Sequence, residues 1–184
     1  MNGQPPRPAL RRRTIALVGL MGVGKSTVGR RLAAVLGMPF KDADTEIERA
    51  AGRSVGELFT ERGEAEFRDG ERRVIARLLD EPAHVLATGG GAFMNAETRA
   101  LMKQKAITIW LKADVDTLVE RVRRKDNRPL LRDRDPRQVL SELMAVRDPF
   151  YAEADIAIDA VDGPHERTVQ AILMALEDHP ESRS

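Results

Sequence analysis

Residues 19–26 read Gly19-Leu20-Met21-Gly22-Val23-Gly24-Lys25-Ser26 and match the phosphate-binding pattern G-x-x-x-x-G-K-[ST] at every specified position. A β-branched apolar run, Thr14 to Val18, precedes this stretch, and a helical pattern from Thr27 to Leu36 follows it. In a strand–loop–helix arrangement the backbone N–H groups converge on phosphates at a helix N-terminus. We therefore expect a nucleoside triphosphate to bind here.

The loop also predicts individual roles. Lys25 is expected to reach the β- and γ-phosphates, and the Ser26 hydroxyl is expected to bind Mg²⁺. The alternative is a glycine-rich turn that binds nothing. The expected nucleotide-binding residues of this loop are Gly22, Val23, Gly24, Lys25, Ser26 and Thr27.

The bulk composition excludes several classes of function. A chain of 184 residues suits one domain. A formal net charge of +1 gives no sign of a nucleic-acid or membrane partner. The absence of cysteine excludes disulfides, thiolate metal sites and cysteine nucleophiles, and it fits the cytoplasm. No apolar run approaches the roughly 18 to 20 residues of a membrane span.

Strand and helix patterns alternate along the chain, which predicts an α/β fold with a five-stranded parallel sheet and helices on both faces. We expect a disordered basic tail over 1–13, one domain over 14–178 and a short tail over 179–184. The expected strands cover 14–18, a short run from 38 to the acids at 42 and 44, 84–88, 106–111 and 155–158. Helices are expected after the capping box at 54–57, around 67–79, and over 95–104, 114–125, 135–147 and the segment after 164.

Two short motifs follow predicted strands. Asp42 and Asp44 could direct one carboxylate to the Mg²⁺ shell and one to a substrate hydroxyl, or one of them could simply cap the next helix. Gly89-Gly90-Gly91 offers close backbone approach to a ligand, or is only a flexible turn. Because Thr88 stands where many related loops carry an acid, Asp42 is the candidate for the acid near the metal.

Arginines form the remaining candidates. The charged segment Asn127 to Asp135 could be an arm that closes over the phosphates, or a solvated loop. Arg68 and Arg147 could bind an anionic substrate or be ordinary surface residues. The three histidines lie in no metal-ligand spacing, so they are not expected to bind a metal.

Taken together, the motifs resemble the shikimate kinase family, whose members phosphorylate the 3-hydroxyl of shikimate with ATP in aromatic biosynthesis. The resemblance runs from about Thr14 to Leu176 and implies a single-domain P-loop kinase fold with a mobile lid over about 126–136. Beyond the phosphate loop, it rests on Asp42-Ala43-Asp44, Phe67-Arg68-Asp69-Gly70-Glu71, Gly89-Gly90-Gly91, Arg128-Pro129-Leu130-Leu131 and Arg147-Asp148-Pro149-Phe150-Tyr151.

The resemblance implies a shikimate site in which Arg68 and Arg147 hold the carboxylate and Asp44 holds the hydroxyls. The glycines Gly89, Gly90 and Gly91 would complete the binding turn. It implies catalysis by Lys25, Asp44 and Arg128.

The nucleotide end follows from the same resemblance. Lys25 and Arg128 would contact the transferring phosphate, Ser26 would bind Mg²⁺, and Asp42 would act on the metal through water. Arg124 resembles the adenine-stacking arginine of the family. The base contact near the last strand has no clear counterpart around 162–165.

Other kinds of protein share parts of this pattern. The nearest alternative is another small P-loop kinase, such as a gluconate or nucleoside monophosphate kinase. A GTPase or ATP-switch domain is disfavoured because the chain has no N-K-x-D segment and no D-x-x-G signature. We expect a cytoplasmic monomer that binds ATP, Mg²⁺ and shikimate, without nucleic-acid or membrane partners.

Overall fold

The computed structural model describes residues 12–124, 131, 133–160 and 163–180. As predicted, five parallel strands form one sheet. Its strand order is β2-β3-β1-β4-β5. In its register Ile15 of the central strand pairs with Val85 on one side and Ile107 on the other. The strands are β1 (Thr14–Val18), β2 (Phe40–Asp42), β3 (Val85–Ala87), β4 (Ala106–Lys112) and β5 (Ile156–Asp159).

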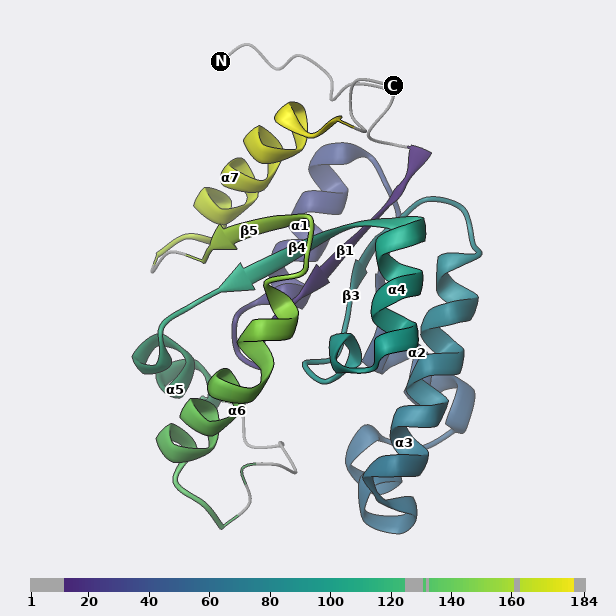
Figure 1. The fold of residues 1–184 in the computed structure, drawn as a ribbon, viewed down its shortest axis with the longest axis vertical. Coiled ribbons are helices and arrows are strands. Elements are labelled where there is room, and N and C mark those ends of the chain that lie inside the picture. The colour runs from purple at the N-terminus through teal and green to yellow at the C-terminus, as the bar shows by residue number, and fades with distance from the viewer. Residues whose placement is uncertain (1–11, 125–130, 132, 161–162, 181–184) are drawn as a thin grey trace.

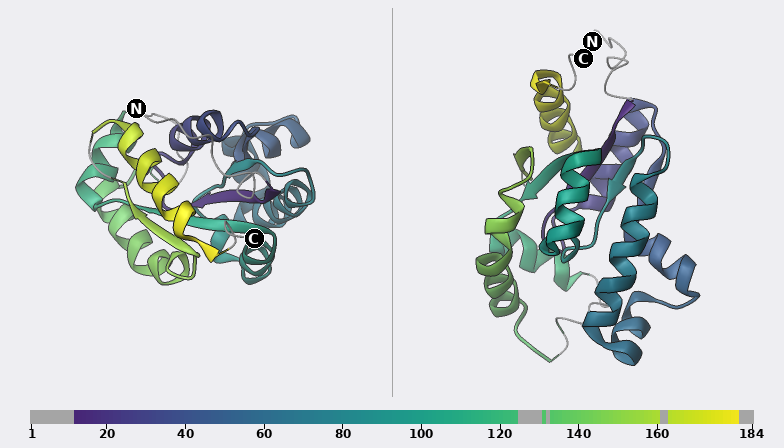
Figure 2. Two further views of the ribbon diagram at one scale, coloured as in Figure 1. Left: turned by 90° about the horizontal axis from the view of Figure 1, so that it is seen from above. Right: turned by 45° about the vertical axis from the view of Figure 1, so that its right-hand side comes forward.

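Helices cover both faces of this sheet (Figures 1 and 2). Helices α1 and α7 pack against each other on one face, and α4 packs against β4 on the other. The helices are α1 (Lys25–Leu36), α2 (Ala43–Ala51), α3 (Val55–Leu79), α4 (Ala96–Lys105), α5 (Val115–Arg123), α6 (Pro136–Tyr151) and α7 (His165–Asp178), with a 3₁₀ turn, η2 (Ala92–Met94).

The core lies around the central strands, whose residues are mostly apolar and which helices cover on both faces. Every residue of β1 and β3 is buried. Beyond the carboxyl ends of the strands the helices separate into two groups, with α2 and α3 on one side and α5 and α6 on the other (Figure 1). Ligands of open α/β sheets bind at this edge.

Side-chain caps define most of the helix starts. Ser54 and Glu57 form the predicted reciprocal capping box of α3. Helices α1 and α7 differ, because their N-cap residues Gly24 and Pro164 make no side-chain hydrogen bond to the helix. The other caps are Asp42 on α2, Asn95 on α4, Asp114 on α5 and Asp135 on α6.

Two helices run further than the sequence predicted. The two helical segments expected between 54 and 79 form one element, α3, which is interrupted at Gly63 by non-helical backbone angles (φ 79°, ψ 171°). Helix α6 passes through Pro149 and ends at Tyr151, not near Arg147.

The expected tails and lid fall mostly outside the described residues. Residues 1–11, 125–130, 132 and 181–184 are not described, so Arg128 and most of the lid predicted at 126–136 lie outside the structure. Leu131 packs against the main core. Within the described ranges, no helix is both long enough and apolar enough to cross a membrane.

Candidate active site

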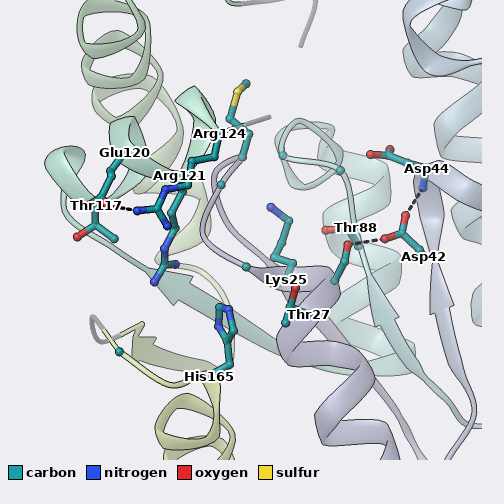
Figure 3. A pocket seen from close by; sticks show the side chains of 17 residues that line it. Lys25, Thr27, Asp42, Asp44, Thr88, Thr117, Glu120, Arg121, Arg124 and His165 are labelled. Atoms are coloured by element: carbon teal, nitrogen blue, oxygen red, sulfur yellow. Dashed lines mark hydrogen bonds and ion pairs between the residues drawn. The ribbon is translucent and has the colours of Figure 1, made fainter. Parts of the chain in front are cut away.

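A cavity of about 680 Å³ opens at the carboxyl edge of the sheet, between the two groups of helices. Its walls come from the phosphate loop, the start of α2, the glycine turn after β3, helix α5 and the start of α7. Figure 3 shows Arg121 and Arg124 on one side, Asp42 and Asp44 on the opposite side, and Lys25 between them. The cavity therefore has a basic wall and an acidic wall with a lysine between them.

The phosphate loop has the geometry that an anion needs. Gly24 adopts left-handed backbone (φ 99°) immediately before α1, and α1 has no side-chain cap, so its first N–H groups face the cavity side. The Lys25 ammonium, 8% exposed, donates hydrogen bonds to the carbonyl oxygens of Gly19 (2.7 Å) and Leu20 (2.9 Å). Helix N-terminus and ammonium together fit a triphosphate.

Asp42 caps the next helix, which is one of the roles that the sequence left open, and its second carboxylate oxygen contacts the phosphate loop. Its Oδ1 caps α2 by accepting from the N–H groups of Asp44 (3.0 Å) and Thr45 (3.3 Å). Its Oδ2 accepts from the Ser26 hydroxyl at 2.5 Å. The described residues contain no cluster of three or more His, Asp or Glu that could hold a metal alone. A hydroxyl beside one carboxylate suits Mg²⁺, because this ion usually takes most of its ligands from water molecules and from phosphate oxygens of the substrate.

Asp44 is an exposed residue that lines the cavity. Partial loss of water around its carboxyl inside the cavity, together with the neighbouring charge of Asp42, raises the pKa of that carboxyl, and Lys25 opposes the shift. Such a carboxylate accepts a proton more readily than a fully hydrated one.

Arg68 of α3 is held by an acidic partner. Its Nη1 bonds Glu71 Oε1 at 2.9 Å, and its guanidinium carbon lies 5.6 and 5.2 Å from the ring centroids of Phe59 and Phe67. Glu71 is only 2% exposed, and burial raises the pKa of its carboxyl against the opposing charge of Arg68. Among the described residues its Oε2 has no hydrogen-bond partner. The sequence motif contained Glu71 without indicating that it would be buried.

Arg147 of α6 is 7% exposed, so it is not the surface arginine that the sequence left possible. No carboxylate lies within ion-pair distance of it in the described part of the chain. Its closest site neighbours are Gly90 and Tyr151. A buried guanidinium in this position is suited to an anionic ligand.

The glycine triplet is explained by packing. A Cβ atom on Gly91 would lie 2.3 Å from Arg68 Nη2, and one on Gly90 would lie 3.1 Å from Arg147 Nη1. A Cβ on Gly89 would lie 2.9 Å from an oxygen of Glu71, and 3.1 Å from Asp44 Oδ1. The turn is therefore the point where the site side chains of α2, α3 and α6 meet.

The opposite wall contains residues that the sequence did not indicate. The His165 ring at the start of α7 lies 3.3 Å from where a Cβ of Gly24 would stand, and burial and the charge of Arg121 lower the His165 pKa. Arg121 Nη1 donates to the Val23 carbonyl at 3.0 Å. Arg124 forms an exposed ion pair with Glu120. The sequence predicted a helix after 164, but it gave no sign that its first residue, His165, lies beside the phosphate loop.

The predicted site residues thus fall into three groups. Val23 is buried behind the loop, whereas Arg68, Gly91 and Arg147 lie beside the cavity around the glycine turn. Arg128 lies outside the described residues. The cavity itself is lined by Gly22, Gly24, Lys25, Ser26, Thr27, Asp42, Asp44, Gly89, Gly90 and Arg124.

Comparison with known proteins agrees with this geometry. The family model described as shikimate kinase matches residues 21–177. The chain belongs to the shikimate kinase family. It is 68% identical over 167 residues to a shikimate kinase of Caulobacter vibrioides (strain NA1000 / CB15N), covering 91% of this chain and 84% of that one. A shikimate kinase from Acinetobacter baumannii, solved in complex with shikimate, is 41% identical with a TM-score of 0.88 and covers 92% of this chain and 97% of that one.

Membership of the shikimate kinase family gives the activity. The chain is a kinase that phosphorylates the 3-hydroxyl of shikimate with ATP and Mg²⁺, in aromatic amino-acid biosynthesis. The gluconate kinase alternative is not favoured. A gluconokinase from Sinorhizobium meliloti 1021 is 20% identical, with a TM-score of 0.63 over 90% of this chain and 92% of that one, and shares only the fold.

Proposed function

We propose that phosphoryl transfer takes place in the cavity at the carboxyl edge, with shikimate at the glycine turn and the nucleotide on the phosphate loop. The observation that carries this proposal is the meeting of two arginines, Arg68 and Arg147, at Gly90 and Gly91 beside Asp44. An acceptor with one carboxylate and several hydroxyls matches that set of groups.

Arg68 and Arg147 bind the shikimate carboxylate through charge-assisted hydrogen bonds. Arg147 is buried and has no ion-pair partner among the described residues, so the substrate supplies the charge that balances it. Glu71 and the two phenylalanine rings orient Arg68 before the substrate arrives. Asp44 accepts the hydrogen of the reacting hydroxyl, and its raised pKa favours that step.

MgATP supplies the γ-phosphoryl group and the charge of the metal. The start of α1 and the Lys25 ammonium hold the phosphates, Ser26 contributes a hydroxyl to the metal, and Asp42 orients that hydroxyl. Arg124 contacts the adenine, and His165 and Arg121 border the same region. The role of Arg128 on the transferring phosphate rests on the family resemblance alone.

We propose that the enzyme acts as a monomer, because no step of the proposed reaction needs a residue of a second copy, and the lack of cysteine supports a cytoplasmic enzyme. Nothing in the net charge of +1 supports a nucleic-acid partner. Equilibrium sedimentation tests the first point. A dimer that persists at nanomolar concentration contradicts it.

A coupled assay of ADP release tests the function directly. Purified protein with MgATP releases ADP rapidly only after shikimate is added, and chelation of divalent metal abolishes the activity. Gluconate serves as the control acceptor, because gluconate kinases share this fold. Equal ADP release without shikimate, or turnover with gluconate alone, contradicts the proposal.

A further inference from the structure

The last residue of α6, Tyr151, is fully buried, with an exposure of 0%. Its ring centroid lies 5.9 Å from that of Trp110. Its hydroxyl donates a hydrogen bond to the carbonyl oxygen of Gly90, and the guanidinium of Arg147 lies against Gly90, where its charge acts on the same hydroxyl. One phenol therefore connects the glycine turn to the arginine that lies against it.

This hydroxyl is not needed for packing. A phenylalanine would fill the same space, and burying a hydroxyl in a core is unfavourable unless it is hydrogen-bonded. Both of its partners belong to the substrate site, since Gly90 lines the cavity and Arg147 packs on Gly90. Burial raises the pKa of Tyr151 to about 12, so the phenol keeps its proton and donates at neutral pH.

The position of Tyr151 on α6 explains how it can reach Arg147. Residues four apart on a helix share one face, and Tyr151 follows Arg147 by four positions. Two backbone hydrogen bonds hold the chain at the end of the helix. The Ala154 N–H donates to the Tyr151 carbonyl (2.9 Å), and the Ala152 N–H donates to the Asp148 carbonyl (2.9 Å). Tyr151 is therefore fixed at both its backbone and its hydroxyl.

We propose that Tyr151 is a positioning residue for shikimate binding, which fixes the Gly90 backbone and through it the place of the Arg147 guanidinium that receives the substrate carboxylate. The proposal rests on the role of Arg147 proposed above. Tyr151 does not touch the substrate. An arginine that is already oriented loses less side-chain freedom on binding, so the hydroxyl strengthens affinity by preorganisation.

The test replaces only the hydroxyl, in Tyr151→Phe. The KM for shikimate rises about tenfold, as expected for loss of a buried hydrogen bond that orients a charged group. The KM for ATP is unchanged, and kcat stays within about threefold because the reacting groups are untouched. Trp110→Phe is the matched control, since it shortens the ring beside Tyr151 without altering the hydrogen bond from Tyr151 to Gly90. It lowers the melting temperature but leaves both KM values as they are.

The Arg147→Ala variant and the double variant Tyr151→Phe/Arg147→Ala complete a double-mutant cycle, which measures the coupling between the two residues. If Tyr151 acts through Arg147, Tyr151→Phe adds little to the shikimate KM once Arg147 is removed. An unchanged shikimate KM in Tyr151→Phe, or a rise shared equally with the KM for ATP, overturns the inference. An unchanged shikimate KM in Arg147→Ala overturns the role proposed for Arg147 instead, so the two failures are distinguishable.

Discussion

Each glycine of the 89–91 turn lies too close to a site side chain to carry a methyl group without displacing it. Gly91 is the tightest, with its missing Cβ 2.3 Å from Arg68 Nη2 and ordinary backbone angles (φ −91°). Gly91→Ala therefore displaces the arginine without straining the turn. We expect shikimate affinity to fall by about tenfold or more, as for loss of one charge-assisted hydrogen bond, with ATP affinity unchanged. Calorimetric titration with each ligand measures both.

Gly70→Ala is the matched control for this variant. A Cβ at Gly70 has no atom within 4 Å, although Gly70 stands only two residues from Arg68 on the same helix. Its shikimate affinity should equal that of the parent chain. If the Gly91→Ala protein binds shikimate with the affinity of the parent chain, shikimate binding does not depend on the observed position of the Arg68 guanidinium.

Asp44→Asn removes the charge and the basicity of the carboxylate but keeps its shape. We expect turnover to fall on the order of 10²-fold, as for loss of a general base. The pKa of Asp44 is raised in the folded protein, so its ionisation opposes folding once the pH exceeds the pKa of the unfolded chain. The asparagine variant should consequently melt at the same temperature as the parent at pH 7, or above it. Thermal melts from pH 4 to 8 test the sign, and an early-melting variant with normal turnover would mark Asp44 as structural only.

Arg68→Ala and Arg147→Ala should each weaken shikimate binding by roughly 2–4 kcal/mol, because the bound carboxylate loses a charged partner. ATP affinity should barely change. Arg62→Ala is the control on α3, since Arg62 is exposed and, among the described residues, forms its ion pair with Glu66 (3.0 Å). Calorimetry that finds all three variants equal to the parent contradicts the carboxylate site.

At the scale of elements, α3 offers a comparison within one helix. Gly63 and Gly70 both have open space where a Cβ would stand, but only Gly63 has positive φ (79°). Gly63→Ala should destabilise the protein by about 1–2 kcal/mol through backbone strain alone. Gly70→Ala should stabilise it by about 0.5–1 kcal/mol, because alanine favours a helix interior over glycine. Urea melts measure both, and changes of the same sign would contradict the broken helix.

Local chemistry made most elements predictable. The capping box at Ser54 and the helix starts expected at 95, 114 and 135 agree with helix beginnings that the structure has. The joining of two helical segments into α3 was not predictable. It depends on the backbone angles that Gly63 adopts, and the spacing of apolar residues along the sequence does not report those angles. The passage of α6 through Pro149 likewise overrides a local signal, because buried Tyr151 anchors the last turn.

At the scale of the whole molecule, the sequence predicted many of the residues that line or border the cavity but not how they meet. The rule that parallel strands present their carboxyl ends to one edge placed Asp42 and the glycine turn together with the phosphate loop. It could not place Arg68 and Arg147, which belong to helices far apart in the chain and converge only through packing. The sequence did not predict His165 as a site residue for the same reason, because only the packing of α7 beside α1 brings it to the cavity.

The uncapped start of α1 also affects how the purified protein behaves in common buffers. Sulfate and inorganic phosphate are small oxyanions that compete for the same N–H groups and lysine. We expect sulfate to raise the melting temperature by mass action and to raise the apparent KM for ATP, while chloride at equal ionic strength does neither. Equal effects of the two salts would point to general screening. A protein stored in ammonium sulfate will therefore show a higher melting temperature and a weaker apparent affinity for ATP than the same protein stored in chloride.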